Sequence, residues 1–207
     1  MKIQKANISS DLNGIVQLHI KVFPNFFMTN MGNLFLKEYY QALLEYPKNI
    51  SLVAVQNDQV VGFIVGFGDP PLFYKFYRQR YKRLIIPILL AIIQKPKLIS
   101  RTFFNFRRTN SVKAEKYEVE MSSIAVNPLN KGIGHLLVDN FIEIARQERY
   151  SSIYLTTDKE NNYKVNSFYQ KQGFFLEKTF LSDQRTMNLY RLILSNNNTS
   201  YRDNEKN

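Results

Sequence analysis

The chain has 207 residues, of which 44% are hydrophobic and 14% aromatic, and this apolar content predicts a folded globular protein rather than a disordered one. It contains no cysteine, which excludes disulfides, thiolate metal ligands and a cysteine nucleophile, and its two histidines, His19 and His135, do not suggest a metal centre. We therefore expect no metal. The polar N-terminal stretch MKIQKANISSDLNGI does not resemble a secretory signal and favours a cytoplasmic protein.

The net charge of +11 is concentrated in one segment. From Tyr74 to Arg108 the chain has ten cationic residues and no acid, so 11 − 10 leaves +1 for all the rest. The ten are Lys75, Arg78, Arg80, Lys82, Arg83, Lys95, Lys97, Arg101, Arg107 and Arg108. A partner recognised through positive charge should therefore contact this segment.

The first part of the chain predicts one strand, two helices and a hairpin. Residues 2–8 alternate weakly and suit a strand, after which Ser10 or Asp11 is expected to cap a helix to about Val22. Helical spacing of apolar residues predicts a second helix over 33–46. The runs SLVAVQ and QVVGFIVGF are joined by Asn57-Asp58 and are typical of a β-hairpin.

Residues 72–111 are predicted to form a basic, aromatic insertion. The apolar run LIIPILLAII at 84–93 has about half of the ~20 residues that a membrane-spanning helix needs, and Pro87 interrupts it. We therefore predict a bent, amphipathic surface segment rather than a transmembrane helix.

The second part predicts strands at 116–126 and 151–157, with helices from Gly132 to about Arg149 and over 165–172. Two further strands, FFLEKTF and RTMNLYRLIL, precede a polar tail at 196–207 that we expect to be disordered. The mixture of hairpins and a crossover predicts an α/β (α+β) fold: a mixed, mostly antiparallel central sheet with helices on both faces. Residues 1–195 are predicted to be one domain.

The stretch VNPLNKGIGHLL places a strand, a tight turn and a helix start in succession. Unpaired amides at the positive end of a helix form an anion site, and Gly132 and Gly134 have no Cβ to block a phosphate. Lys131 and His135 are possible additional donors. The alternative is that the glycines only make the turn, because the stretch has neither the third glycine of GxGxxG nor the ending of a P-loop.

Two linked segments resemble the GNAT superfamily of acetyl-CoA-dependent N-acetyltransferases: EMSSIAVNPLNKGIGHLLVDNFI and, some forty residues later, NYKVNSFYQKQGF. The resemblance implies that Gly132, Ile133 and Gly134 form a turn that cradles the pyrophosphate of acetyl-CoA. It also implies that Asn162 and Tyr169 lie beside the pantetheine and sulfur of this co-substrate. One position departs from the family: Leu129 stands where Gln or Arg is usual.

The resemblance also suggests catalytic roles. Glu120 matches the position of a general base, and Glu118 lies on the same strand face. Alternatively, both glutamates are solvated strand residues or form ion pairs with Lys113, Lys116 and Lys178. The amides of Ile124, Ala125 and Val126 are expected to hold the thioester carbonyl, and Tyr169 is expected to be the general acid unless it only packs.

Direct attack by the amine in a ternary complex is expected, because Ser167 has no neighbouring base in sequence to activate it for acyl-enzyme chemistry. The acceptor suggested by resemblance is an amino sugar of cell-surface polysaccharide synthesis, on a nucleotide or lipid carrier.

The basic insertion has aromatic residues that suit the headgroup region of an anionic membrane surface. They are Phe73, Tyr74, Phe76, Tyr77, Tyr81, Phe103, Phe104 and Phe106. A packed helical lid or a homodimer contact is the alternative, and nucleic acid is a minority hypothesis because no nucleic-acid module is recognisable. The second hypothesis for the whole chain is a non-catalytic protein that binds a membrane or nucleic acid through this insertion.

Overall fold

The structure, a computed structural model, describes residues 1–94, 117–182 and 185–194. The second half of the predicted basic insertion and the polar tail at 196–207 therefore lie outside the described residues. So do Lys113 and Lys116.

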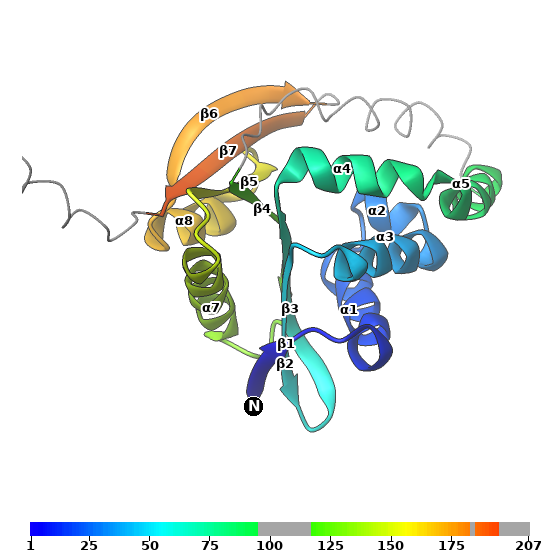
Figure 1. The fold of residues 1–207 in the computed structure, drawn as a ribbon, viewed down its shortest axis with the longest axis horizontal. Coiled ribbons are helices and arrows are strands. Elements are labelled where there is room, and N and C mark those ends of the chain that lie inside the picture. Colours follow the sequence, from blue (N-terminus) through cyan, green and yellow to red (C-terminus); the bar gives the residue numbers. More distant parts are fainter. Residues whose placement is uncertain (95–116, 183–184, 195–207) are drawn as a thin grey trace, which may run out of the picture.

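A single seven-stranded sheet forms the centre of the fold, in the order β1-β2-β3-β4-β5-β7-β6 (Figure 1). All neighbours are antiparallel except β4 and β5, which are parallel. The strands are β1 (Lys2–Lys5), β2 (Asn49–Gln56), β3 (Gln59–Gly68), β4 (Glu118–Val126), β5 (Ser152–Asp158), β6 (Phe175–Ser182) and β7 (Arg185–Ile193). The predicted fold class is thus confirmed.

Helices cover both faces of the sheet (Figure 1). One face packs against α1 (Ile8–Val22) and α3 (Asn33–Glu45), and the other against α7 (Ile133–Gln147). The remaining described helices are α2 (Phe27–Asn30), α4 (Pro70–Gln79), α5 (Tyr81–Gln94) and α8 (Tyr163–Lys171). The sequence did not predict α2, because four residues are too few to show a helical period.

The first helix starts earlier than predicted. Asn7, not Ser10 or Asp11, is the N-cap, and its side chain accepts hydrogen bonds from the amides of Ser9 and Ser10. Asp11 turns back and accepts from the amide of Asn7 at 2.8 Å, which satisfies another backbone donor. The early cap also shortens the first strand, which ends at Lys5.

The sheet separates two apolar clusters. The cluster beneath α7 is centred on fully buried residues such as Leu137 and Phe141, and the cluster beneath α1 and α3 includes Ile15, Leu43 and Phe63. Strand β4 contributes to both, since alternate side chains of a strand point to opposite faces. The strand β4 is therefore fixed by apolar packing on both faces of the sheet.

Strand β4 also carries a β-bulge. Val65 of β3 pairs with Ser123 but Gly66 pairs with Met121, so Ser122 is the extra residue. The hydroxyls of Ser122 and Ser123 both meet tyrosines of α3: Tyr39 at 2.5 Å and Tyr40 at 3.3 Å. These contacts fix the bulge against the helix.

A buried histidine supports the same helix. Nδ1 of His19 lies 2.6 Å from Oη of Tyr40, whose hydroxyl donates to Ser123, so Nδ1 carries the proton and donates to Tyr40. Nε2 of His19 is buried and has no partner among the described residues. Burial lowers the pKa of His19 from 6.5 to about 4, because a charged ring would leave an unpaired donor in the core.

Acid should therefore destabilise the fold through His19. Between pH 6.5 and about 4 the unfolded chain binds this proton more readily than the folded chain, so the free energy of unfolding falls as the pH falls through that window. At about pH 5 the loss relative to pH 7 is about 2 kcal/mol. Urea unfolding of His19→Gln should lack this part of the pH dependence. His135→Gln, at an exposed position, is the matched control, and an unchanged profile in His19→Gln would contradict the assignment.

Candidate active site

The parallel ladder between β4 and β5 stops after three residue pairs. Glu118, Val119 and Glu120 pair with Ser152, Ile153 and Tyr154, and beyond them β4 pairs only with β3 while β5 pairs only with β7. In Figure 1 the part of the sheet made of β5, β7 and β6 curves away from the part made of β1 to β4. Within the described ranges, the last residues of β4 therefore have one edge without a partner strand.

The hydrogen-bond phase of β4 shows which backbone groups face that edge. The amide of Asn127 donates to the carbonyl of Val61 at 2.8 Å, so Asn127 and, two residues earlier, Ala125 direct their amides toward β3. The amides and carbonyls of Ile124 and Val126 therefore point to the open edge. Ala125 helps to position them but directs its own amide away.

The turn after β4 leads directly into α7. Gly132 is the N-cap and has a φ of +86°, a conformation that side chains rarely adopt, so a glycine is needed there for the backbone alone. Gly134 is different: an added Cβ would meet Phe168 at an ordinary 3.6 Å. Packing therefore does not explain the second glycine.

The turn leaves a run of amides unpaired. The amides of Leu129 and Asn130 are bonded to Asn127, the first through its side chain and the second through its carbonyl. By contrast, the described part of the chain offers no acceptor to the amides of residues 131–135. These donors lie at the positive end of a 15-residue helix, an arrangement that suits an anion.

Lys131 brings a positive charge to this turn, whereas Leu129 brings none. Lys131 is exposed, and Leu129 is 88% exposed at the position where the family usually has Gln or Arg. Nδ1 of His135 lies 2.6 Å from Oε1 of Gln172, and Nε2 of Gln172 donates to Asp139. Nδ1 therefore donates to Gln172, which leaves Nε2 as the ring nitrogen that can face a ligand.

Helix α8 brings the second motif to the turn. The ring of Phe168 lies 4.9 Å from that of His135 and beside Gly134. Asn162, just before the helix, donates through Nδ2 to Oγ1 of Thr157 at 2.8 Å and to the carbonyl of Asp158 at 3.0 Å. Asn162 thus ties the start of α8 to the end of β5.

Tyr169 follows Phe168 on the same helix and is 6% exposed. Its ring packs against Phe168, Phe174 and Tyr190. Burial alone raises the pKa of its hydroxyl well above the usual 10, so the group stays protonated at neutral pH. The ring of Tyr169 thus packs within the apolar cluster, and its role as general acid stays a prediction.

Glu120 is the last residue of β4 that pairs with β5, so it stands where the strands part. Tyr74 of α4 donates to both carboxylate oxygens at 3.0 and 2.9 Å, and Tyr154 of β5 donates to Oε2 at 2.8 Å. Both carboxylate oxygens of Glu120 thus accept hydrogen bonds from tyrosine hydroxyls. Sequence reasoning missed both tyrosines as partners, because no spacing along the chain relates residues 74 and 154 to 120.

Glu118 has a structural role. It is buried, it pairs with Arg191 of β7 and it accepts from the hydroxyl of Ser152 at 2.7 Å. Solvent or a lysine was the alternative environment expected from the sequence, and the partner is instead Arg191, an arginine 73 residues further along the chain. Because the guanidinium also bonds to Glu177 and to Ser152, the pair joins β4, β5, β6 and β7 where the ladder is still intact.

The insertion aromatics named as possible lipid contacts face inward where they are described. Phe73 is 1% exposed and stacks on Phe67, and Tyr74, Phe76 and Tyr77 are half-buried against the same core cluster. This burial excludes Phe73 as a membrane contact, and the packing of all four residues agrees with the alternative of a helical lid on the domain. The helical period of α4 turns them toward the sheet, which is why one of them reaches Glu120.

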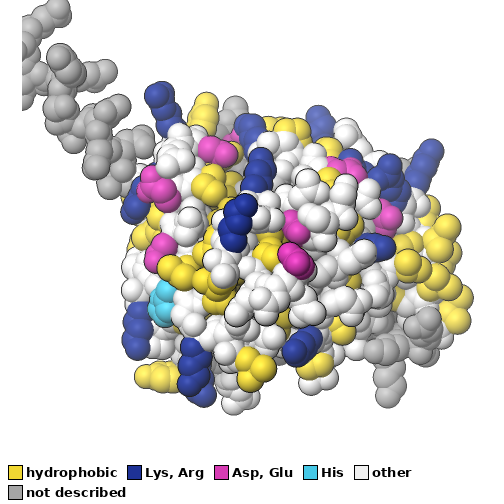
Figure 2. All heavy atoms as spheres, turned by 90° about the horizontal axis from the view of Figure 1, so that it is seen from below, with side chains coloured by type: hydrophobic (Ala, Val, Ile, Leu, Met, Phe, Trp, Pro, Cys, Tyr) yellow, Lys and Arg dark blue, Asp and Glu magenta, His cyan; other side chains and the backbone are white. Residues whose placement is uncertain are grey.

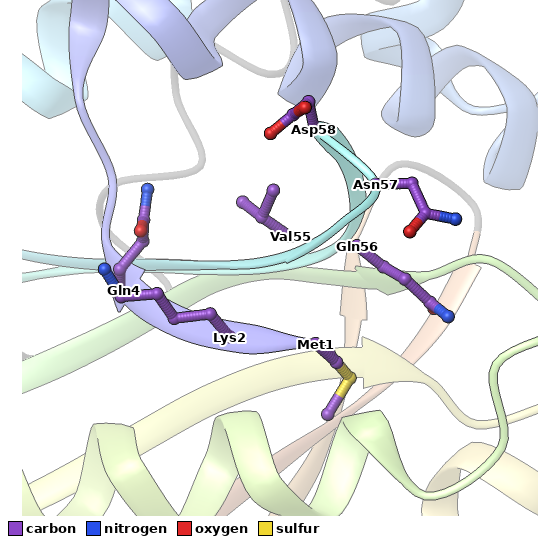
Figure 3. A pocket seen from close by; sticks show the side chains of 7 residues that line it. All are labelled: Met1, Lys2, Gln4, Val55, Gln56, Asn57 and Asp58. Atoms are coloured by element: carbon purple, nitrogen blue, oxygen red, sulfur yellow. The ribbon is translucent and has the colours of Figure 1, made fainter.

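A pocket within the described ranges, 1–94, 117–182 and 185–194, contacts neither Glu120 nor Tyr169. It lies between β1 and the β2–β3 hairpin and is lined by none of the candidate site residues (Figure 3). Its lining residues are Met1, Lys2, Gln4, Val55, Gln56, Asn57 and Asp58. Over the same ranges, no group of three or more His, Asp or Glu residues is arranged to hold a metal ion.

The model of the acetyltransferase (GNAT) family matches residues 13–174, which is 162 of the 207 residues. The chain therefore belongs to the GNAT family of acetyltransferases. No curated protein matches it.

Solved structures agree at the level of the fold. A GNAT-family protein from Desulfovibrio desulfuricans has a TM-score of 0.63 at 14% identity, covering 94% of this chain and 99% of that one. A ribosomal-protein-alanine N-acetyltransferase from Brucella melitensis has a TM-score of 0.62 at 16% identity, with 94% and 100% covered. An aminoglycoside 6′-acetyltransferase type Ii has 0.61 at 15% identity, with 95% and 99% covered.

Proposed function

We propose that this chain moves an acetyl group from acetyl-CoA to a primary amine by direct attack in a ternary complex. The observation that carries the proposal is the continuity of two sets of unpaired amides: those of Ile124 and Val126 on the open edge of β4, and those of 131–135 at the start of α7. Together they offer donors to an extended ligand that is a diphosphate at one end and a carbonyl at the other.

In this proposal the turn binds the diphosphate through its backbone. The amides of Lys131, Gly132, Ile133, Gly134 and His135 would donate to the phosphate oxygens, and Gly134 keeps the approach open. Leu129 supplies no donor, so the backbone has to provide what a side chain usually adds in this family. Asn162 and Tyr169 would flank the pantetheine, because α8 packs directly on the turn.

Different residues of the chain would then carry out the separate steps of the reaction. Glu120 takes a proton from the attacking amine nitrogen, and the amides of Ile124 and Val126 donate to the carbonyl oxygen as it gains negative charge. The hydroxyl of Tyr169 donates its proton to the departing sulfur. Acetyl-CoA, when bound, supplies the activated thioester.

The side of the sheet on which Glu120 lies determines how the acceptor enters. Tyr74 and Tyr39 come from helices on the α1–α3 face, and Tyr39 bonds to Ser122 on the bulge beside Glu120. The hydroxyls of Tyr74 and Tyr154 contact the carboxylate, and those of Tyr39 and Ser122 are paired with each other on the neighbouring bulge. A polyhydroxylated amine suits such surroundings, which supports an amino sugar on a nucleotide or lipid carrier as acceptor. We place the reaction in the cytoplasm.

A second candidate function is binding without catalysis, to a membrane or to nucleic acid. The observation that favours it is Leu129, whose exposed apolar side chain replaces a usual phosphate ligand of the family. A chain of this kind would not hold acetyl-CoA tightly. The next experiment separates the two functions.

Acetyl-CoA should protect the amides of 131–135 from hydrogen exchange. We also expect these amides to form two or more charge-assisted hydrogen bonds to the diphosphate. Acetyl-CoA should therefore bind about 100-fold more tightly than S-acetylpantetheine, which has no diphosphate. Exchange measured by NMR and affinity measured by calorimetry provide the two readouts. Equal affinity for both compounds, or unchanged exchange at 131–135 in the complex, would reject the assignment.

Replacing Tyr169 by Phe removes only the hydroxyl and should lower kcat about 100-fold or more. The affinity for acetyl-CoA should change less than about threefold, because the ring and its packing remain. Thiol release with a panel of amino sugars measures kcat. Tyr190→Phe, which removes a hydroxyl from the same aromatic cluster, is the control, and equal effects of the two substitutions would exclude Tyr169 as the acid.

Glu120→Gln keeps the shape of the side chain but removes the base, and should lower kcat/KM for the amine about 100-fold. Raising the pH should restore part of the rate, since a larger fraction of the amine is then neutral without help. Glu118→Gln is the contrasting variant: it breaks a buried ion pair and should reduce the free energy of unfolding by about 3 kcal/mol. Full activity of Glu120→Gln at neutral pH would remove Glu120 from the mechanism.

A further inference from the structure

Helix α5 has apolar side chains on both of its faces. Leu84, Pro87, Ile88 and Ala91 lie on one face, and the last two pack against α2 and α3. The opposite face is formed by Ile85, Ile86, Leu89, Leu90 and Ile93, whose exposed fractions are 45%, 66%, 54%, 40% and 76%. At about 100° per residue these five cover an arc of about 140° on the side away from the protein. The polar outer face expected of an amphipathic helix is therefore missing.

A water-facing helix normally has polar residues on its outer side, so this stripe requires an explanation. Hydrophobic side chains gather at the right edge of Figure 2, where α5 lies in Figure 1. The part of the chain that the structure describes has no helix able to cross a bilayer, and α5 has only 14 residues. Contact along the surface of a membrane is therefore the relevant geometry, not insertion across it.

Exposed positive charge accompanies the stripe. Lys82 stands on the same arc at the start of α5, Arg83 borders it, and Lys75 and Arg78 are exposed on the preceding helix. Between Pro70 and Gln94 the sequence has no acidic residue. Arg80 does not add to this charge, because it pairs with Glu45. Long cationic side chains beside an apolar face suit a layer of anionic headgroups over hydrocarbon.

We propose that the outer face of α5 docks on the surface of an anionic lipid bilayer. The five apolar side chains lie below the headgroups, and Lys82 and Arg83 lie among the headgroups. A second copy of the chain is the less suitable occupant, because a symmetric contact would bring the cations of both copies together without an acid to neutralise them. Nucleic acid would engage the cations but leave the isoleucines and leucines in water. The proposal concerns binding and holds whether or not the chain is catalytic.

Helix α4 links the docking face to the candidate base, Glu120. Helix α4, separated from α5 only by Arg80, carries Tyr74 to the carboxylate of Glu120. Aromatic contacts of Phe73 and Tyr77 hold α4 on the core, so its link to the site is fixed by packing. One helix, held by these contacts, therefore connects the proposed docking face with the candidate base.

The full chain, without acetyl-CoA, is mixed with sucrose-loaded vesicles of phosphatidylcholine alone or with an equal share of phosphatidylglycerol, and sedimented. Binding to the anionic vesicles should be at least tenfold tighter than to the neutral ones, and raised salt should weaken it. Ile86→Gln combined with Ile93→Gln should lower the affinity at least tenfold. Lys82→Gln combined with Arg83→Gln should abolish most of the preference for anionic vesicles.

The matched control is Leu181→Gln combined with Ile193→Gln, which changes two residues that are 74% and 58% exposed on β6 and β7. Its binding should stay within twofold of the original chain, and thermal unfolding should show that all variants are folded. Absent binding to anionic vesicles, or equal binding by the α5 variant, would overturn the proposal. A dimer in light scattering that the α5 variant converts to a monomer, without vesicle binding, would overturn it in favour of self-association.

Discussion

The early end of the β4–β5 ladder is the feature on which the rest of the site depends. A strand at the centre of a sheet normally uses both edges for hydrogen bonds, and β4 does so only from Glu118 to Glu120. Beyond that point its amides on one edge must be satisfied by something other than a strand, because unpaired backbone groups inside a protein are unfavourable. The intact end of the ladder is held by the buried pair of Glu118 and Arg191, so the separation begins at a defined residue.

The proposed catalytic and binding groups follow one another along the chain from the end of the β4–β5 ladder. Glu120 is at the point of separation, the amides of Ile124 and Val126 follow it along the open edge, and the free amides of α7 come next. Helix α8 closes the other side and carries Tyr169 in an apolar setting that keeps its hydroxyl protonated. In the proposed mechanism the carboxylate of Glu120, bonded to two tyrosines, is the base, and the phenol of Tyr169, kept neutral by burial, is the acid.

The acceptor side and the outer surface are connected through one segment of the chain. Residues 70–94 form α4 and α5, of which the first supplies Tyr74 to Glu120 and the second exposes an apolar stripe. The inward aromatics and the outward isoleucines and leucines thus have different tasks, although they share one basic segment. That division is invisible in composition, since both kinds of residue contribute to the same apolar content.

The sequence alone was enough to predict the class of fold, the order of the main elements and the family. Alternation and helical spacing are local properties of the sequence. The two family motifs, one from Glu120 to Gly134 and one from Asn162 to Tyr169, are each contiguous in the sequence as well. Tertiary structure decided the partners: Tyr74 and Tyr154 on Glu120, Arg191 on Glu118, and the direction in which Phe73 and Ile86 point. These contacts join residues tens of positions apart, and their geometry follows from strand register and helix rotation. A rotation or a shift by one residue would reverse them without any change in local pattern.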